Sequence, residues 1–189
     1  MTAEKKKQGV RTTGIPSKAE LEASPGYPSR EALATGPIVV IECVQDIPCD
    51  PCEAACPRGA IRVGNLITNL PVFYAKKCNG CGSCIPICPG QAIFRVDMTY
   101  SEERATVSFP YEFLPMPRKG DMVQAVNRAG EVVCEAEVLR VQNPRGFAHT
   151  AVITVAVAKD LAMEVRSMKR LKRIDHPIHA STQGMGLRK

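Results

Sequence analysis

The chain has 189 residues, of which 44% are hydrophobic and 23% charged, proportions typical of a globular protein of one or two domains. Its longest apolar run, residues 151–158, is far shorter than the ~20 residues of a membrane span, and no apolar segment follows its basic start. The net charge of +6 lies in residues 166–189. We therefore expect a cytoplasmic protein with neither a membrane span nor a secretory signal. In that reducing compartment its nine cysteines are expected to bind metal rather than to form disulfides.

Residues 1–37 have the composition of an arm rather than of a domain, because prolines and glycines interrupt them throughout. Ser17 and Glu20 have the spacing of a capping box, and residues 29–36 allow a second helical turn. Neither helix buries much alone, so we expect an extended arm laid over a partner or over this chain, with disorder as the alternative. Residues 38–41, Ile-Val-Val-Ile, then predict a strand that leads to Cys43.

A cysteine motif is repeated in the middle of the chain. Two copies of C-x2-C-x3-C-P lie 32 residues apart, the first with Cys49, Cys52 and Cys56 and the second with Cys81, Cys84 and Cys88. Such self-similarity indicates one duplicated structural unit. Cys78 completes the second copy. At the equivalent place of the first copy stands Asp46, and Cys43 lies three residues before it.

The completed second copy, C-x2-C-x2-C-x3-C-P, resembles the signature of bacterial two-cluster [4Fe-4S] ferredoxins, and the resemblance covers residues 38–97. It implies a pseudo-twofold dicluster domain in which the last cysteine of each run binds the other cluster. Carried over residue by residue, cluster A is held by Cys43, Cys49, Cys52 and Cys88, and cluster B by Cys78, Cys81, Cys84 and Cys56. We expect a short helix to begin at each Cys-Pro, and Gly80 and Gly82 to let backbone N–H groups approach the sulfides.

Three alternatives concern the metal. In cluster A, Asp46 could replace Cys43 as an oxygen ligand, or the site could hold a [3Fe-4S] cluster in place of a cubane. Thiolate is the softer ligand for iron, so Cys43 is preferred. Two structural zinc sites are the other possibility, although zinc rarely needs a third closely spaced cysteine followed by Cys-Pro.

The charges near the motifs also differ. Acidic residues crowd the first motif (Asp46, Asp50, Glu53) and Lys76 and Lys77 precede the second, which predicts a lower reduction potential for cluster A.

The C-terminal half has the pattern of a small antiparallel sheet or barrel. Strands are predicted over residues 94–100, 105–109 and 150–158, with a hairpin over residues 121–141. Asp160 is a candidate cap for a final helix whose apolar side carries Leu161, Val165, Met168 and Leu171. Cys134 lies among apolar residues of one strand, so we expect a core side chain rather than a reactive thiol or a ligand.

The predicted fold class is therefore α+β. An extended arm (1–37) precedes a ferredoxin-like dicluster domain (38–104), a small antiparallel β module (105–159), and a C-terminal helix with a basic tail (160–189). The tail holds seven basic residues and no aromatic one, so we expect a solvated terminus that orders against a partner subunit and does not bind nucleic acid. His176 and His179 in this tail, and His149, are weak candidates for metal binding.

The motifs that are missing from the chain narrow its function. It has neither a phosphate-binding P-loop nor a Rossmann glycine pattern, and it lacks the C-x3-C-x2-C spacing associated with radical enzymes that use S-adenosylmethionine. With a protein ligand on every iron we expect no catalytic site, only single-electron transfer through two [4Fe-4S] clusters. The arm, β module and tail favour an iron–sulfur subunit of a larger hetero-oligomeric oxidoreductase. A free soluble ferredoxin and a metal-braced nucleic-acid-binding module are the alternatives.

A second resemblance points to a flavoprotein partner. The motif Glu42-Cys43-x4-Pro48-Cys49-x-Pro51-Cys52, with the later stretches 119–121 (Lys-Gly-Asp) and 127–130 (Asn-Arg-Ala-Gly), is similar to the ferredoxin-like subunit of flavin-dependent amino-acid dehydrogenases of the proline or hydroxyproline type. This resemblance covers residues 38–168. It implies that flavin on a partner subunit oxidises the substrate and that the clusters of this chain carry the electrons onward.

Overall fold

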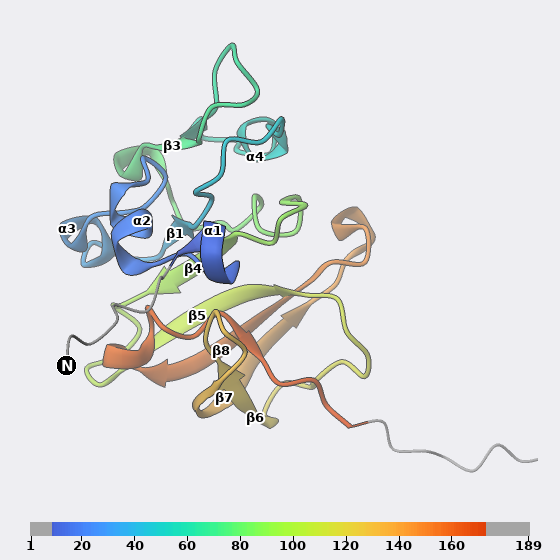
Figure 1. Ribbon diagram of the computed structural model, residues 1–189. Helices are drawn as coiled ribbons and strands as arrows, with labels where there is room; N and C mark the ends of the chain where they lie inside the picture. The colour runs from blue at the N-terminus through green and yellow to red at the C-terminus, as the bar shows by residue number, and fades with distance from the viewer. Residues whose placement is uncertain (1–8, 173–189) are drawn as a thin grey trace, which may run out of the picture.

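The computed structural model describes residues 9–172, which form a mostly antiparallel β structure with few, short helices (Figure 1). One seven-stranded sheet has the order β1-β4-β5-β8-β7-β6-β9, and a two-stranded sheet pairs β2 with β3. The strands are β1 (Ile38–Ile41), β2 (Ile61–Arg62), β3 (Val72–Phe73), β4 (Ile93–Asp97), β5 (Arg104–Tyr111), β6 (Met122–Val126), β7 (Val132–Gln142), β8 (Ala151–Ala158) and β9 (Ser167–Met168). The helices are α1 (Val10–Thr13), α2 (Lys18–Ala23), α3 (Arg30–Leu33) and α4 (Pro51–Ala54), with 3-10 turns η1 (Ala75–Lys77), η2 (Arg145–Phe147) and η3 (Lys159–Leu161). No helix of this part is long and apolar enough to cross a membrane.

Strand β1 is apolar throughout because it lies between two hydrophobic cores. Successive side chains of a strand point to opposite faces, so Ile38 and Val40 enter the core of the large sheet. Val39 and Ile41 enter a second core that also contains several of the motif cysteines. A continuous Ile-Val-Val-Ile run, rather than an alternating one, is what a strand buried on both faces requires.

The large sheet joins the cysteine-rich region to the C-terminal half. Strand β4 follows the second cysteine motif and pairs with β1 on one side and with β5 on the other. Strand β8 is rich in β-branched residues, and it pairs with β5 along the whole length of both strands. One sheet therefore spans the predicted boundary at residues 104 and 105.

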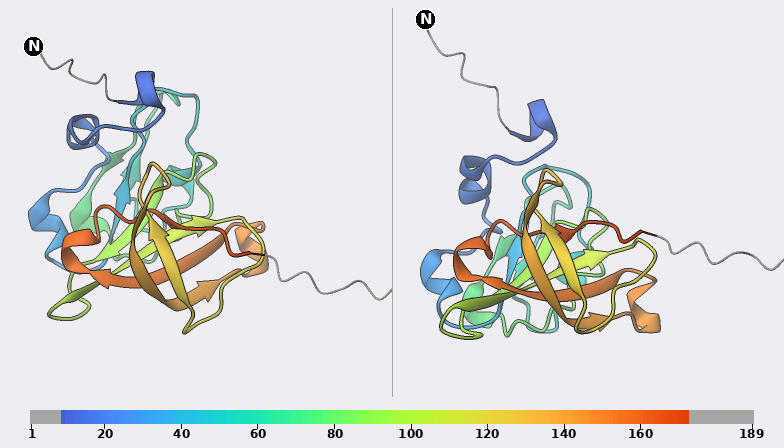
Figure 2. Two further views of the ribbon diagram at one scale, coloured as in Figure 1. Left: turned by 60° about the horizontal axis from the view of Figure 1, so that its bottom comes forward. Right: turned by 90° about the horizontal axis from the view of Figure 1, so that it is seen from below.

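The far end of the sheet curls. Strand β9 pairs with β6 and also lies against β5, and bulges interrupt the pairing of β7 with both of its neighbours. Figure 2 shows the β6–β7 hairpin crossing strand β8 at a steep angle. Bulges increase the local twist, and this twist lets the β6, β7 and β9 end of the sheet curl over the large hydrophobic core.

The N-terminal arm lies on this chain. Ser17 and Glu20 form the expected capping box of α2, and Ser29 caps α3. Leu21 and Leu33 are buried, at 3% and 8% exposure. Backbone N–H of Phe73 donates to the carbonyl of Pro25 at 3.0 Å, so the arm is also hydrogen-bonded to the end of β3.

The predicted C-terminal helix is wrong. The chain forms the short turn η3 and then strand β9, in which Met168 pairs with Ala125. The apolar spacing that suggested a helix is satisfied differently, because Ala162 and Val165 enter the large core from an irregular segment and Met168 enters it from β9. The remainder of the basic tail, with His176 and His179, lies outside the described residues.

The short helices expected after each Cys-Pro are also absent from the described residues. A turn follows Cys56-Pro57, closed by Gly59 N–H donating to the Cys56 carbonyl at 3.1 Å, and Gln91 N–H closes the equivalent turn on Cys88 at 3.0 Å. Gly59 and Gln91 have φ of +59° and +50°, which a right-handed helix does not allow. The helix of the first motif, α4, lies before Cys56 and has Pro51 at its first position.

Candidate metal centres

The eight motif cysteines line two pockets. The first pocket contains Cys43, Cys49, Cys52 and Cys88, and the second contains Cys56, Cys78, Cys81 and Cys84. Each pocket thus has three thiols from one copy of the motif and a fourth from the other copy. These are the two groups that the ferredoxin resemblance implies. Apolar side chains complete the walls, with Ile41 and Ile93 in the first pocket and Val39 and Ile61 in the second.

The fourth thiol of each pocket is held in the same way. Backbone N–H of Ala60 donates to Sγ of Cys56 at 3.2 Å, and backbone N–H of Ala92 donates to Sγ of Cys88 at 3.4 Å. Both contacts arise from the turn that the sequence Cys-Pro-x-x-Ala forms. Hydrogen bonds to cysteine sulfur stabilise the thiolate and tune the potential of iron–sulfur sites. The duplicated sequence therefore builds a duplicated local structure.

The loop of the second pocket depends on glycine. Gly80 has φ of +66°, and a Cβ added to it would stand 2.3 Å from the carbonyl oxygen of Pro37. Its N–H lies 3.4 Å from Sγ of Cys78, and its carbonyl accepts from Nε of Arg95 at 2.7 Å. The loop therefore packs between Pro37, which precedes β1, and the side chain of Arg95 in β4. Only a residue without a Cβ allows this close approach.

Several of the thiols are in an environment that opposes the free thiolate. Burial, followed by the neighbouring cysteines, raises the pKa of Cys52 to about 11 and also raises the pKa of Cys43 and Cys84. For Cys81, burial alone would raise the pKa, but hydrogen bonds from Ser83 and nearby backbone N–H groups outweigh it and lower the pKa. Four thiolates in one buried pocket need compensating cations. A thiolate-only donor set in an apolar pocket fits iron in a sulfide cluster, with zinc as the other thiophilic metal.

Asp46 does not line the first pocket and is exposed, whereas Cys43 lines it. The carboxylate of Glu53 is turned toward β2. It accepts from backbone N–H of Gly64 at 2.9 Å, from Arg62 at 2.8 Å and from backbone N–H of Val63 at 2.6 Å, and these bonds lower its pKa to about 2. Of the three acidic residues near the first motif, Asp46 and Asp50 thus remain without an ion pair among the described residues. The lower potential of cluster A stays a prediction.

A buried ion-pair cluster lies directly beside Cys43, and the sequence did not reveal it. Glu42 is 7% exposed, and its carboxylate accepts from Nε of Arg128 at 2.7 Å and from Nε of Arg166 at 2.7 Å. Arg166, assigned above to a solvated tail, is 4% exposed and stacks over the ring of Phe94. Burial lowers the pKa of Arg166 and Glu42 offsets part of that effect. The sequence signal for this buried cluster was Glu42, a charged residue that directly follows the fully apolar strand β1.

Further side chains fix or flank this region. The Ser24 hydroxyl in the arm donates to the carbonyl of Cys43 at 3.0 Å. A cavity of about 620 Å³ lies between the arm and the β6–β7 turn, with Tyr27, Arg128 and Met163 in its walls and none of the cysteines. Cys134 is partly buried against the large core, as expected from its strand.

Comparison with known proteins identifies the cysteine-rich region. Residues 43–99 match the family model of the LdpA Fe-S cluster-binding domain. One of the subunits of the ion-translocating oxidoreductase complex of Methanosarcina acetivorans is 45% identical over 47 residues, 25% of this chain and 17% of that protein. The polyferredoxin protein MvhB of Methanothermobacter marburgensis is 37% identical over 49 residues, 22% of this chain and 12% of that protein. Protein Pixie of Drosophila melanogaster is 29% identical over 108 residues, 48% of this chain and 17% of that protein.

The chain thus spans less than a fifth of the length of these relatives. No solved structure gives a significant match. The comparisons support an iron–sulfur-binding domain of the ferredoxin type and an electron-transfer role for it. They do not support the more specific resemblance to an amino-acid dehydrogenase subunit, which remains a matter for proposal.

Proposed function

We propose that this chain is the electron-transfer iron–sulfur subunit of a multi-subunit oxidoreductase and carries two [4Fe-4S] clusters. The observation that supports the proposal is the division of eight cysteines between two pockets, each with one thiol from the opposite motif copy. Cluster A is assigned to Cys43, Cys49, Cys52 and Cys88, and cluster B to Cys78, Cys81, Cys84 and Cys56. When bound, such clusters accept and release one electron at a time.

The protein contributes three things to this function. The cysteines hold the metal with thiolate. Backbone N–H groups of Ala60, Gly80 and Ala92 donate to ligand sulfurs and favour the more negative, reduced state. Apolar walls such as Ile41, Ile61 and Ile93, each about 1% exposed or less, exclude water from the buried side of the pockets. No residue near the pockets is needed as an acid or base, because single-electron transfer moves no proton by itself.

We further propose a flavin-containing partner subunit, with an amino-acid dehydrogenase as the specific candidate. The name of the Methanosarcina relative describes a subunit of an oxidoreductase complex, and that of the Methanothermobacter relative describes a polyferredoxin. Both descriptions agree with a chain that passes electrons between other redox centres. The flavin itself, and the proline or hydroxyproline type of substrate, rest on the second sequence resemblance.

The decisive experiment is to measure iron, zinc and acid-labile sulfide on protein purified without oxygen. Two cubanes require about eight iron and eight sulfide per chain. We expect Cys84→Ala to lose about half of both, since it removes a ligand of one cluster only. The matched control is Cys134→Ala, which removes the ninth cysteine and is expected to keep the full content. Zinc without sulfide would overturn the proposal.

A free electron carrier is the second candidate, and one measurement separates it from a subunit. A carrier is monomeric and redox-active alone, whereas a subunit co-purifies with a flavoprotein when isolated from its native source at low salt. Recovery of the tagged chain without any flavin-containing partner, as a stable monomer, would favour the carrier.

A further inference from the structure

The segments that carry the two thiol pockets differ in charge, although Glu42 and Glu53 of the first segment are paired with arginines. Residues 42–53, which carry most of the first pocket, contain four acidic residues and no lysine or arginine. Residues 54–84, which carry the whole second set of cysteines, contain four basic residues and no acidic one. The sequence alone suggested a difference in potential from this pattern. The structure adds where the basic charges lie and what they surround.

Three exposed cations border the second pocket, and we call Arg58, Lys76 and Lys77 the basic rim. Arg58 lines the pocket itself, and the two lysines form the turn η1 directly before Cys78. None of the three has an ion-pair partner within residues 9–172. Arg62, the fourth basic residue of this stretch, is instead paired with Glu53 at 2.8 Å. The rim therefore presents uncompensated positive charge to solvent.

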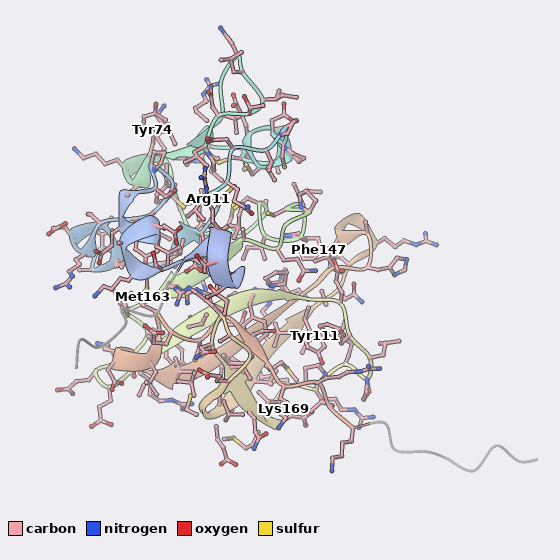
Figure 3. The ribbon with its side chains drawn as sticks, viewed as in Figure 1. Arg11, Tyr74, Tyr111, Phe147, Met163 and Lys169 are labelled. Carbon is pink, nitrogen blue, oxygen red and sulfur yellow. The ribbon has the colours of Figure 1, made fainter. Side chains whose placement is uncertain are left out.

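The rim is held as one surface rather than as three separate side chains. Backbone N–H of Tyr74 donates to the carbonyl of Ala60 at 2.8 Å, which ties the turn carrying Arg58 to the loop carrying the lysines. The ammonium of Lys77 lies 5.2 Å from the centre of the Tyr74 ring. Figure 3 shows Tyr74 at the end of the molecule opposite Lys169 and Tyr111, away from the curled part of the sheet.

The pocket that Arg58 lines also contains the most accessible thiol. Cys81 is exposed, and the other seven proposed ligands are buried or half-buried. A protein docked on the rim therefore lies next to the pocket that contains this exposed thiol. Charged rims around an exposed redox edge raise the encounter rate with oppositely charged partners and fix their orientation.

We propose that the basic rim is the docking surface for an acidic face of an electron-transfer protein, so that electrons pass between this chain and that partner at Cys81. This inference rests on the proposed function. A protein partner is favoured over nucleic acid because single-stranded nucleic acid is bound on rows of stacked aromatic side chains, and Tyr74 is the one exposed aromatic residue within residues 54–84.

The test uses the full, iron-loaded chain, reduced with dithionite and freed of excess reductant. Its oxidation is followed with two one-electron acceptors of opposite charge, cobalt(III)-EDTA, an anion, and hexaamminecobalt(III), a cation. Each cobalt(III) takes one electron from the protein and becomes cobalt(II), and no group is transferred. The triple variant Arg58→Glu, Lys76→Glu and Lys77→Glu is compared with Lys119→Glu, Arg140→Glu and Lys169→Glu, which changes the net charge equally in the C-terminal half of the described chain.

We expect the rim variant to slow oxidation by the anion by about tenfold at low salt and to speed oxidation by the cation, whereas the control variant changes either rate by less than about threefold. Equal effects of the two variants would overturn the proposal that the basic rim is the docking surface. Salt-sensitive binding of a single-stranded oligonucleotide, abolished in the rim variant, would overturn the choice of a protein partner. If the rim variant loses iron, the salt dependence of the oxidation rates is compared between the wild-type protein and the control variant instead. Wild-type protein that contains both clusters yet reduces neither complex would instead refute the proposed function.

Discussion

At the scale of single residues, the second pocket depends on the absence of a side chain at Gly80. Its positive φ and the 2.3 Å that would separate an added Cβ from the Pro37 carbonyl leave no room for alanine without moving backbone. We predict that Gly80→Ala displaces the Cys78–Cys81 loop and lowers the iron content to about half, since one cluster of two is lost.

Gly90→Ala is the control for this prediction. Gly90 follows Cys88-Pro89 in the same motif, its φ lies outside the left-handed region, and an added Cβ meets nothing within 4 Å. Iron content and the visible absorbance per chain report both variants. Full iron in the Gly80→Ala protein would show that the loop tolerates the shift.

The buried ion pairs of Glu42 carry a second residue-scale prediction. Glu42→Gln removes the charge that two buried arginines share, and breaking a buried pair in this way costs about 3–5 kcal/mol. Glu137→Gln removes the exposed pair with Arg104, at 3.4 Å, and should cost less than about 1 kcal/mol. Urea unfolding of both variants without oxygen measures the difference. Equal midpoints would contradict a structural role for the cluster.

At the scale of elements, the first two helices of the arm are joined to each other through the carboxylate of Glu20. This group accepts from backbone and hydroxyl of Ser17 and from backbone N–H of Val10, which joins α1 to α2. The Ser17 hydrogen bonds, aided by Val10, lower its pKa below the usual 4.5. The stabilisation is therefore fully present above pH 4.5 and is lost as pH falls through the lower pKa of the folded state.

We accordingly predict that amides of residues 10–21 exchange faster, relative to their intrinsic rates, as pH falls from about 6 to about 3. In Glu20→Gln the same amides should exchange faster at every pH and show no such dependence. Hydrogen exchange followed by mass spectrometry measures both proteins. A pH dependence that persists in Glu20→Gln would assign the effect to another group.

At the scale of the whole molecule, the cysteine-rich region and the β module share one sheet. Strand β4 pairs with both β1 and β5, and Glu42 beside the first pocket is bound by arginines that follow β6 and precede β9. We predict that both halves unfold together. Cluster absorbance and the circular dichroism of the sheet should have coincident urea transitions. Two separated transitions would show that residues 38–104 and 105–159 are independent domains.

The sequence determined the local features of the molecule, because these depend on neighbours along the chain. The Ile-Val-Val-Ile run, the capping box at Ser17 and the hairpin near residue 127 all have local causes, whereas the grouping of thiols from two motif copies was implied by the ferredoxin resemblance. The strands of residues 105–159 pair antiparallel, as their short lengths and turns suggested, but they belong to the seven-stranded sheet that also contains β1 and β4. The assignment of the thiols to clusters A and B remains a prediction until iron and sulfide are measured.

Only the tertiary structure decided how distant segments meet. The helix expected after Asp160 became strand β9, because the edge of β6 offered backbone partners and the core accepted the same apolar side chains from an irregular chain. Arg166 looked like part of a solvated basic tail, yet Glu42, 124 positions earlier, draws it into the interior. Pairing energies between residues far apart in sequence depend on where the fold brings them. No pattern of neighbouring residues contains that information.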